Sequence, residues 1–149
     1  MNKNLLIILI PLAFYACTSS NKSEGNEEKA ITEKVEESIE NGVYFVTPKN
    51  GEVVKNPVKL VFGVNGMEVE PAGVAAEGKG HHHVAIDGTF VEKGVVVPAD
   101  SMSIHYGKGQ LETELTLTPG KHTLTMQFAD GFHQSYGEAW SKTIEITVE

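Results

Sequence analysis

From residue 42 to the C-terminus, apolar and polar side chains alternate with a period of two, and this pattern restricts the fold more than any other feature. Successive side chains of a β-strand point to opposite faces, so the alternation predicts half-buried strands. The segments that show it are residues 58–64, 111–117, 123–128 and 144–148. Helical periodicity is absent over the same range, which indicates an all-β domain.

Short turn sequences separate these segments. They are Pro48-Lys49-Asn50-Gly51, Asn56-Pro57, Asn65-Gly66, Asp87-Gly88, Pro119-Gly120 and Asp130-Gly131. Gly, Pro, Asn and Asp each favour a particular turn conformation. Many short strands with regular turns predict an immunoglobulin-like antiparallel β-sandwich over residues 42–149, which is long enough for one hydrophobic core.

The N-terminus has the pattern of an export signal over residues 1–16. Lys3 precedes an apolar run over residues 5–14, which is too short to span a bilayer, and Ala16 precedes Cys17. Residues 14–17 resemble the lipobox of bacterial lipoproteins, which implies a lipid on Cys17, although a plain secretory signal is the alternative. Acylation would remove the chain's single thiol from an oxidising compartment.

Residues 17–41 are predicted to be an acidic, flexible and partly helical tether. The first part is polar with nothing to bury, and Ile31, Val35 and Ile39 then recur at four-residue spacing. With a lipid on Cys17, the chain is expected in the bacterial cell envelope. The residue after Cys17 is Thr18, not the Asp that resembles an inner-membrane retention signal, so the outer membrane is favoured.

Charge composition argues against nucleic acid as a partner. The chain has 20 acidic residues, 12 lysines and no arginine, with a net charge of −8. Arginine supplies the planar fork that binds phosphate, and phosphate contacts dominate the affinity for nucleic acids. The expected partners are therefore the membrane at Cys17 and either a metal ion or another envelope protein.

Three consecutive histidines, His81 to His83, are the main chemical signal. If Val84 and Ile86 face the core, His82 points inward and is expected to be a core residue with its hydrogen bonds satisfied. His81 and His83 then point outward to solvent on one face, at a spacing that can chelate a metal ion. Asp87 continues this outward face. The loops at one end of a sandwich cluster in space, so either His105 or His133 is expected to complete the set.

The ligand inventory indicates copper or zinc. Imidazole nitrogen suits both metals, and Met102 is the best placed thioether, although core packing is the favoured role for the methionines. Calcium is not expected, because the sequence has no Asp-x-Asp cluster. The alternative is a non-catalytic adhesion or interaction module with structural histidines. His122 shares the phase of a core strand and is predicted to be structural. A hydrolase built from Ser101 or Ser103 with a histidine and Asp87 lacks a nucleophile elbow, so no enzyme is predicted.

Five ordered motifs resemble the bacterial family of domains of unknown function numbered 4399. They are Tyr44-Phe45-Val46-Thr47-Pro48, Phe62-Gly63-Val64-Asn65-Gly66-Met67-Glu68-Val69, Gly80-His81-His82-His83, His105-Tyr106-Gly107-Lys108-Gly109-Gln110 and Pro119-Gly120-Lys121-His122-Thr123-Leu124. The resemblance covers residues 43–148. It implies a sandwich fold and an exported setting, and it supplies no activity, so function must be argued from the residues.

Overall fold

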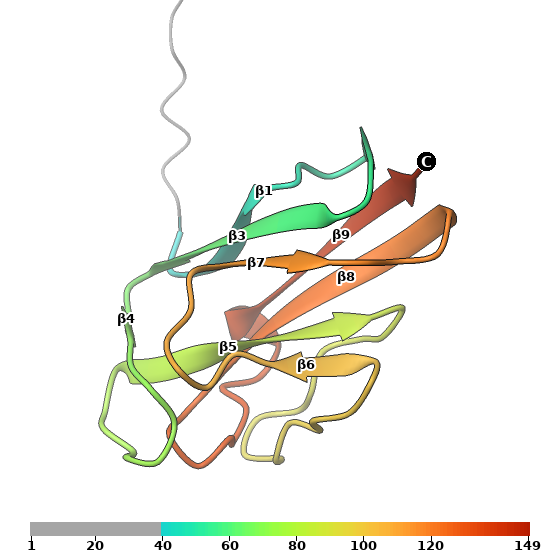
Figure 1. Ribbon diagram of the computed structural model, residues 1–149. Helices are drawn as coiled ribbons and strands as arrows, with labels where there is room; N and C mark the ends of the chain where they lie inside the picture. Colours follow the sequence, from blue (N-terminus) through green and yellow to red (C-terminus); the bar gives the residue numbers. More distant parts are fainter. Residues whose placement is uncertain (1–39) are drawn as a thin grey trace, which may run out of the picture. The chain divides into compact units, whose positions relative to one another are not determined.

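The computed structural model describes residues 40–149, and its strands form two sheets that pack as a sandwich (Figure 1). The smaller sheet has the order β1-β3-β7, comprising β1 (Gly42–Thr47), β3 (Val58–Asn65) and β7 (Glu112–Leu115). The larger sheet has the order β2-β9-β8-β5-β4, comprising β2 (Glu52–Val54), β9 (Ser141–Val148), β8 (Gly120–Ala129), β5 (Lys79–Ile86) and β4 (Glu68–Val69). A short strand, β6 (Ser103–His105), also pairs with β5.

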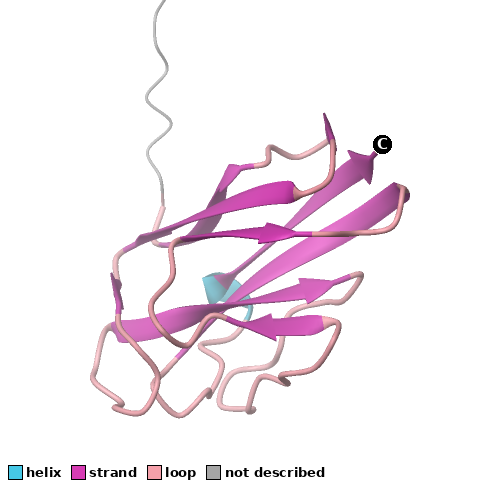
Figure 2. Ribbon diagram, in the orientation of Figure 1, coloured by secondary structure: helices cyan, strands magenta, loops and turns pink. Residues whose placement is uncertain are grey.

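The predicted all-β sandwich is confirmed, and the described chain contains almost no helix (Figure 2). The helical element is η1 (Glu138–Trp140), a single 3-10 turn before β9. Within residues 40–149, no helix has both the length and the apolarity needed to cross a bilayer. The predicted signal segment, Cys17 and residues 18–39 of the tether lie outside the described residues.

Most strand pairs are antiparallel, as the turn spacing predicts, and two pairs at the edges of the larger sheet are parallel. β2 runs parallel to β9, and β4 runs parallel to β5. Alternation specifies which face of a strand is buried, but it does not specify the direction of the neighbouring strand. The sequence therefore predicted the two-layer sandwich but not the parallel direction of these two strand pairs.

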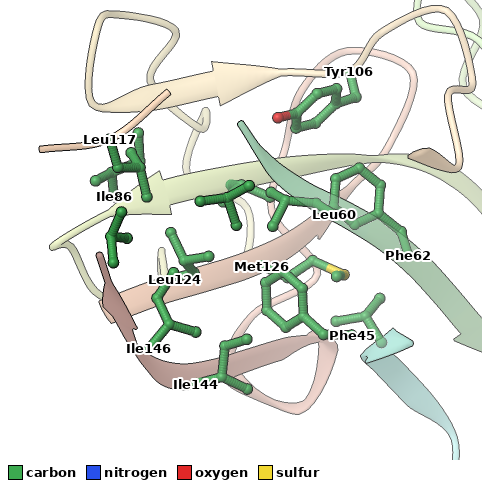
Figure 3. Packing of buried hydrophobic residues seen from close by; sticks show 14 of the residues in the cluster. Phe45, Leu60, Phe62, Ile86, Tyr106, Leu117, Leu124, Met126, Ile144 and Ile146 are labelled. Atoms are coloured by element: carbon green, nitrogen blue, oxygen red, sulfur yellow. The ribbon is translucent and has the colours of Figure 1, made fainter. Parts of the chain in front are cut away.

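The hydrophobic core lies between the two sheets (Figure 3). Its members come from alternate positions of the strands, as the period of two requires. The buried apolar side chains of this core are Val43, Phe45, Val58, Leu60, Phe62, Val84, Ile86, Tyr106, Leu117, Leu124, Met126, Phe128, Ile144, Ile146 and Val148. Leu111 does not join them: it precedes β7 and is 50% exposed, so its predicted inward phase was wrong.

The outer face of β8 is also buried, which the alternation did not predict. Thr125 and Gln127 point away from the core, yet they are 0% and 3% exposed. Loops cover them, and Gln127 binds these loops directly: its side-chain oxygen accepts from the backbone N–H of Val91, and its amide nitrogen donates to the carbonyl of Gly137. The covered face continues onto β5, where the histidines lie.

Candidate metal centre

His81 and His83 project from the same outer face of β5, and His82 projects into the core between them. The core-facing positions of Val84 and Ile86 fix this alternation, so the predicted directions are confirmed. The predicted exposure of His81 and His83 to solvent is wrong, because both are 0% exposed, like His82. The loops that cover β8 also cover this end of β5.

His105 comes to the same face from the end of β6. The antiparallel register places it directly opposite His83, so the two side chains share a face. Its Nε2 atom lies 3.2 Å from Nε2 of His81, the diagonal neighbour. Unlike the histidines of β5, His105 is exposed.

His133 reaches the cluster from the loop that follows β8. Its backbone is left-handed, with φ 68°, and hydrogen bonds hold that shape. The Asp130 carboxylate accepts from the backbone N–H groups of Phe132 and Gln134, and the His133 N–H donates to the Asp130 carbonyl. The loop thus turns the His133 ring toward His81 and His105, with ring centroids 5.1 and 4.7 Å away.

The four rings form one cluster, which we call the histidine cluster (His81, His83, His105 and His133). Ligand nitrogens of His81, His105 and His133 all lie within 4.8 Å of one another, and Nε2 of His83 lies 3.1 Å from Nε2 of His81. Ring centroids of neighbouring pairs are 4.7 to 5.1 Å apart, and only the His83–His133 pair is wider, at 5.9 Å. The sequence predicted that either His105 or His133 would join His81 and His83, and in the structure both of them do.

The pKa values of three rings of the cluster are lowered, which favours their neutral form. Burial lowers the pKa of His81 to about 4, helped by the charges that His105 and His133 would carry, although Asp130 opposes the shift. Burial, followed by repulsion from the other rings, lowers the pKa of His83 to about 3. Desolvation and His133 also lower the pKa of His105. Neutral imidazole is the form that binds a metal ion.

Hydrogen bonding alone does not satisfy the cluster. An imidazole nitrogen carries either one hydrogen or one lone pair, but Nε2 of His81 meets two other Nε2 atoms. Furthermore, the Nδ1 atoms of His81 and His83 are buried and have no hydrogen-bond partner among the described residues. A buried polar group without a partner costs about 1–3 kcal/mol. A cation would instead accept lone pairs from several of the converging ring nitrogens at once, so the donor set fits a metal ion.

His82 lies in the core between aromatic rings. Its ring centroid is 5.2 Å from that of Phe62 and 5.0 Å from that of Phe128. We expected a core histidine with its hydrogen bonds satisfied, and the second half of that expectation is wrong, since neither ring nitrogen has a partner among the described residues. Burial lowers the pKa of His82 to about 4, so this ring is also neutral.

Several other candidates lie apart from the histidine cluster. Asp87 turns away from the outer face because its φ of 54° breaks the strand, and its carboxylate binds His122. The Ser103 hydroxyl donates to the Pro98 carbonyl. Met102, for which core packing was the favoured role, is 48% exposed.

Two residues that shape the cluster were missed at the level of sequence. Asp130 was noted as part of a turn, but its role in holding the His133 loop depends on hydrogen bonds within that loop. Gly107 was noted within a motif, but the structure places it against the His105 ring. The sequence carries no periodic signal for this contact, because Gly107 lies in a turn after the end of β6, where strand alternation no longer applies.

The fold and the cluster define a class: a small β-sandwich protein with four imidazoles gathered under and between the loops at one end. The chain belongs to the family described as Domain of unknown function (DUF4399), whose profile matches residues 60–149. This match contains all four rings and confirms the resemblance noted from the motifs. It leaves β1, β2 and the first residues of β3 outside.

Comparisons with other proteins add little to this assignment. No curated protein matches the chain. Among solved structures, the X-ray structure of the endo-beta-1,4-mannanase from Thermotoga petrophila is similar, with 17% sequence identity and a TM-score of 0.45 over 76% of this chain. The match covers 21% of the mannanase chain, so this chain spans about a fifth of that enzyme's length. The likeness carries no inference about activity.

Proposed function

We propose that this protein is a cell-envelope lipoprotein whose sandwich domain binds one copper or zinc ion through His81, His83, His105 and His133. The observation that carries the proposal is the meeting of ring nitrogens from three separate segments: β5, the end of β6 and the loop after β8. Imidazole nitrogen is the commonest protein ligand of such metals, and these rings converge from segments distant in sequence.

The chemistry of the donors supports copper or zinc. The cluster offers imidazole nitrogen, and neither a carboxylate nor a thiolate belongs to the group of candidate ligand atoms found within the described residues. Such a set suits zinc and copper better than the oxygen-seeking ions calcium and magnesium. With up to four protein ligands, the site would leave no open position on the metal ion, which suits a protein that binds or carries the ion. We propose no enzymatic reaction for it.

In this proposal Cys17 carries the lipid that anchors the protein, and residues 17–41 connect the anchor to the sandwich. The absence of arginine and the net charge of −8 support a partner other than nucleic acid. The outer membrane remains the favoured location, because Thr18 follows Cys17. A test is radiolabelled lipid incorporation, which should occur in the natural chain and be lost in Cys17→Ser.

Elemental analysis of the purified full chain tests the metal proposal. After equilibration with copper or zinc and removal of free metal, the chain should retain about one equivalent, and the double variant His81→Ala/His83→Ala should retain none. His122→Ala is the matched control and should retain the metal. Because the double variant removes two buried rings, His105→Ala provides a second test at an exposed position, and it should bind more weakly. Unchanged metal content in both variants would refute the proposal.

An interaction module is the second candidate, and one observation favours it. Val74 and Phe132 are 65% and 61% exposed on two loops that meet at the cluster end, where the Gly73 N–H donates to the Gly131 carbonyl. Exposed apolar side chains on adjoining loops suit a protein partner. Capture of an envelope protein that survives metal chelation, and that is lost in Phe132→Ser, would support this role.

A further inference from the structure

Gly107 lies against the imidazole of His105. A Cβ atom built on Gly107 would overlap Nε2 and Cε1 of His105, and the three heavy atoms nearest to it all belong to that ring. The backbone of Gly107 is not in the left-handed region, so its conformation does not require glycine. What requires glycine here is the space that the His105 ring occupies.

The same pattern occurs beside two other members of the histidine cluster. Gly80 precedes His81 and Gly131 stands two residues before His133, and neither has a left-handed backbone. A Cβ on Gly80 would overlap the carbonyl oxygen of Ala129, and a Cβ on Gly131 would overlap that of Val74. Each segment that supplies a ring thus makes a close approach that only glycine permits.

We propose that Gly107 is a positioning residue of the metal centre: its missing side chain leaves the space in which the His105 ring turns Nε2 toward His81. The expected effect of Gly107 on metal binding rests on the proposed function. Its effect on the position of the His105 ring rests on the geometry alone. Gly80 and Gly131 serve the same end through the backbone, so substitutions there would disturb the fold itself. Gly107 is the position at which the effect falls on one ring.

Alanine at position 107 should leave the sandwich folded. Its backbone conformation is open to any residue, and the group it meets is an exposed side chain that can rotate away. Rotation of that ring would take its Nε2 out of the 3.2 Å contact with His81. The expected cost is a weaker metal site with little loss of stability.

A double-mutant cycle on the full chain tests the proposal. Zinc affinity is measured by competition with a chromophoric chelator for the natural chain, Gly107→Ala, His105→Ala and the double variant. Gly107→Ala should weaken zinc binding by about 10- to 100-fold, the range for groups that orient a metal ligand. In the His105→Ala background the same change should have no further effect, because the ring through which it acts is gone.

Gly88→Ala is the matched control, because Gly88 also has an ordinary backbone conformation and its added Cβ would meet only the Cβ of Ala85, at 3.0 Å, and a backbone oxygen, at 3.9 Å. It should bind zinc as the natural chain does. Full affinity in Gly107→Ala, or an equal loss with and without His105, would overturn the proposal.

Imidazole nitrogen NMR of the metal-free chain separates this inference from the metal proposal. Gly107→Ala should shift the His105 Nε2 resonance and leave the His122 resonances in place, whether or not the natural chain binds zinc. A natural chain without zinc affinity would refute the proposed function, while the spectra would still decide whether Gly107 positions the ring. Unchanged His105 resonances in Gly107→Ala would refute the positioning role.

Discussion

The same larger sheet carries two histidine sites of opposite character. In the histidine cluster, rings face other rings, and burial lowers the pKa values of His81 and His83. At the other site His122, on β8, contacts a carboxylate and a carbonyl: its Nδ1 lies 2.9 Å from Asp87 Oδ2, and its Nε2 lies 2.9 Å from the Thr118 backbone oxygen. Those bonds, with that to Asp87 the larger cause, raise the pKa of His122.

The difference decides what each site can bind. Both ring nitrogens of His122 lie beside oxygen acceptors, so the protonated ring donates twice and keeps no lone pair for a metal ion. The cluster offers the reverse, several neutral rings with lone pairs and few acceptors. Neighbours, and not the residue type, set the function of a histidine.

Acid should destabilise the metal-free protein, and this is the largest expected effect. The pKa values of His81, His82 and His83 are about 4, 4 and 3 in the folded chain and 6.5 in the unfolded chain. Between these values the unfolded chain binds more protons, so the free energy of unfolding falls as the pH falls. Each ring that stays neutral in the folded chain lowers the free energy of unfolding by about 1.4 kcal/mol for each pH unit of acidification. Urea unfolding at pH 7 and pH 5 measures the change.

The His122→Ala variant is the control for this acid effect. Its free energy of unfolding should fall between pH 7 and pH 5 at least as much as that of the natural chain, because the rings responsible for the fall are in β5. A free energy of unfolding that is flat, or that rises, over this range would contradict the account of the buried rings.

Metal should stabilise the natural chain by a smaller but still large amount. An ion that binds only the folded state adds about 2.7 kcal/mol to the free energy of unfolding when its free concentration is 100 times the dissociation constant. Asp87→Asn, which alters the other histidine site, should gain the same amount. Thermal unfolding with and without zinc measures both, and stabilisation that persists undiminished in His81→Ala/His83→Ala would show that the ion binds elsewhere.

The His122–Asp87 pair should make the smallest contribution, about 0.5–1 kcal/mol, since the Asp87 side chain is 45% exposed. Because the pKa of His122 is raised in the folded chain, its contribution to the free energy of unfolding is complete below pH 6.5. This contribution is lost as the pH rises through the pKa of His122 in the folded chain. Hydrogen bonds from the Thr123 N–H and from His122 lower the pKa of Asp87 in the folded chain. The contribution of Asp87 to the free energy of unfolding is therefore complete above pH 3.8, and it is lost as the pH falls through the pKa of Asp87 in the folded chain. The pair therefore stabilises the protein between these limits.

Asp87→Asn isolates this contribution, because asparagine tolerates the left-handed backbone and can still accept from Thr123. The natural chain should exceed the variant in free energy of unfolding at pH 6, and the two should converge at pH 9. A difference that persists at pH 9 would mean that the charge on His122 is not its source.

The sequence predicted the sandwich because strand alternation and turn residues are local signals. It also predicted which way His81, His82 and His83 point, since Val84 and Ile86 fix the phase of β5. It did not predict that His81 and His83 are buried, because that burial depends on how segments outside β5 pack against them, including those that bring in His105 and His133. Likewise, Asp87 was assigned to the cluster face by extending the strand one residue beyond its end at Ile86.

The cluster as a whole was predicted only as an end of the sandwich where loops meet. The register that sets His105 opposite His83 and the turn that directs His133 are tertiary facts, and neither leaves a periodic signal. The space at Gly107 is also tertiary, since the sequence records a glycine but not the ring that lies against it.

X-ray absorption spectroscopy of the zinc-loaded full chain tests the central claim most directly. The account predicts a first shell of nitrogen at about 2.0 Å, with outer-shell scattering from three or four imidazole rings and no sulfur. In His122→Ala the spectrum should not change. A first shell dominated by oxygen, or imidazole scattering that survives in His81→Ala/His83→Ala, would contradict the claim that these rings converge on a metal ion.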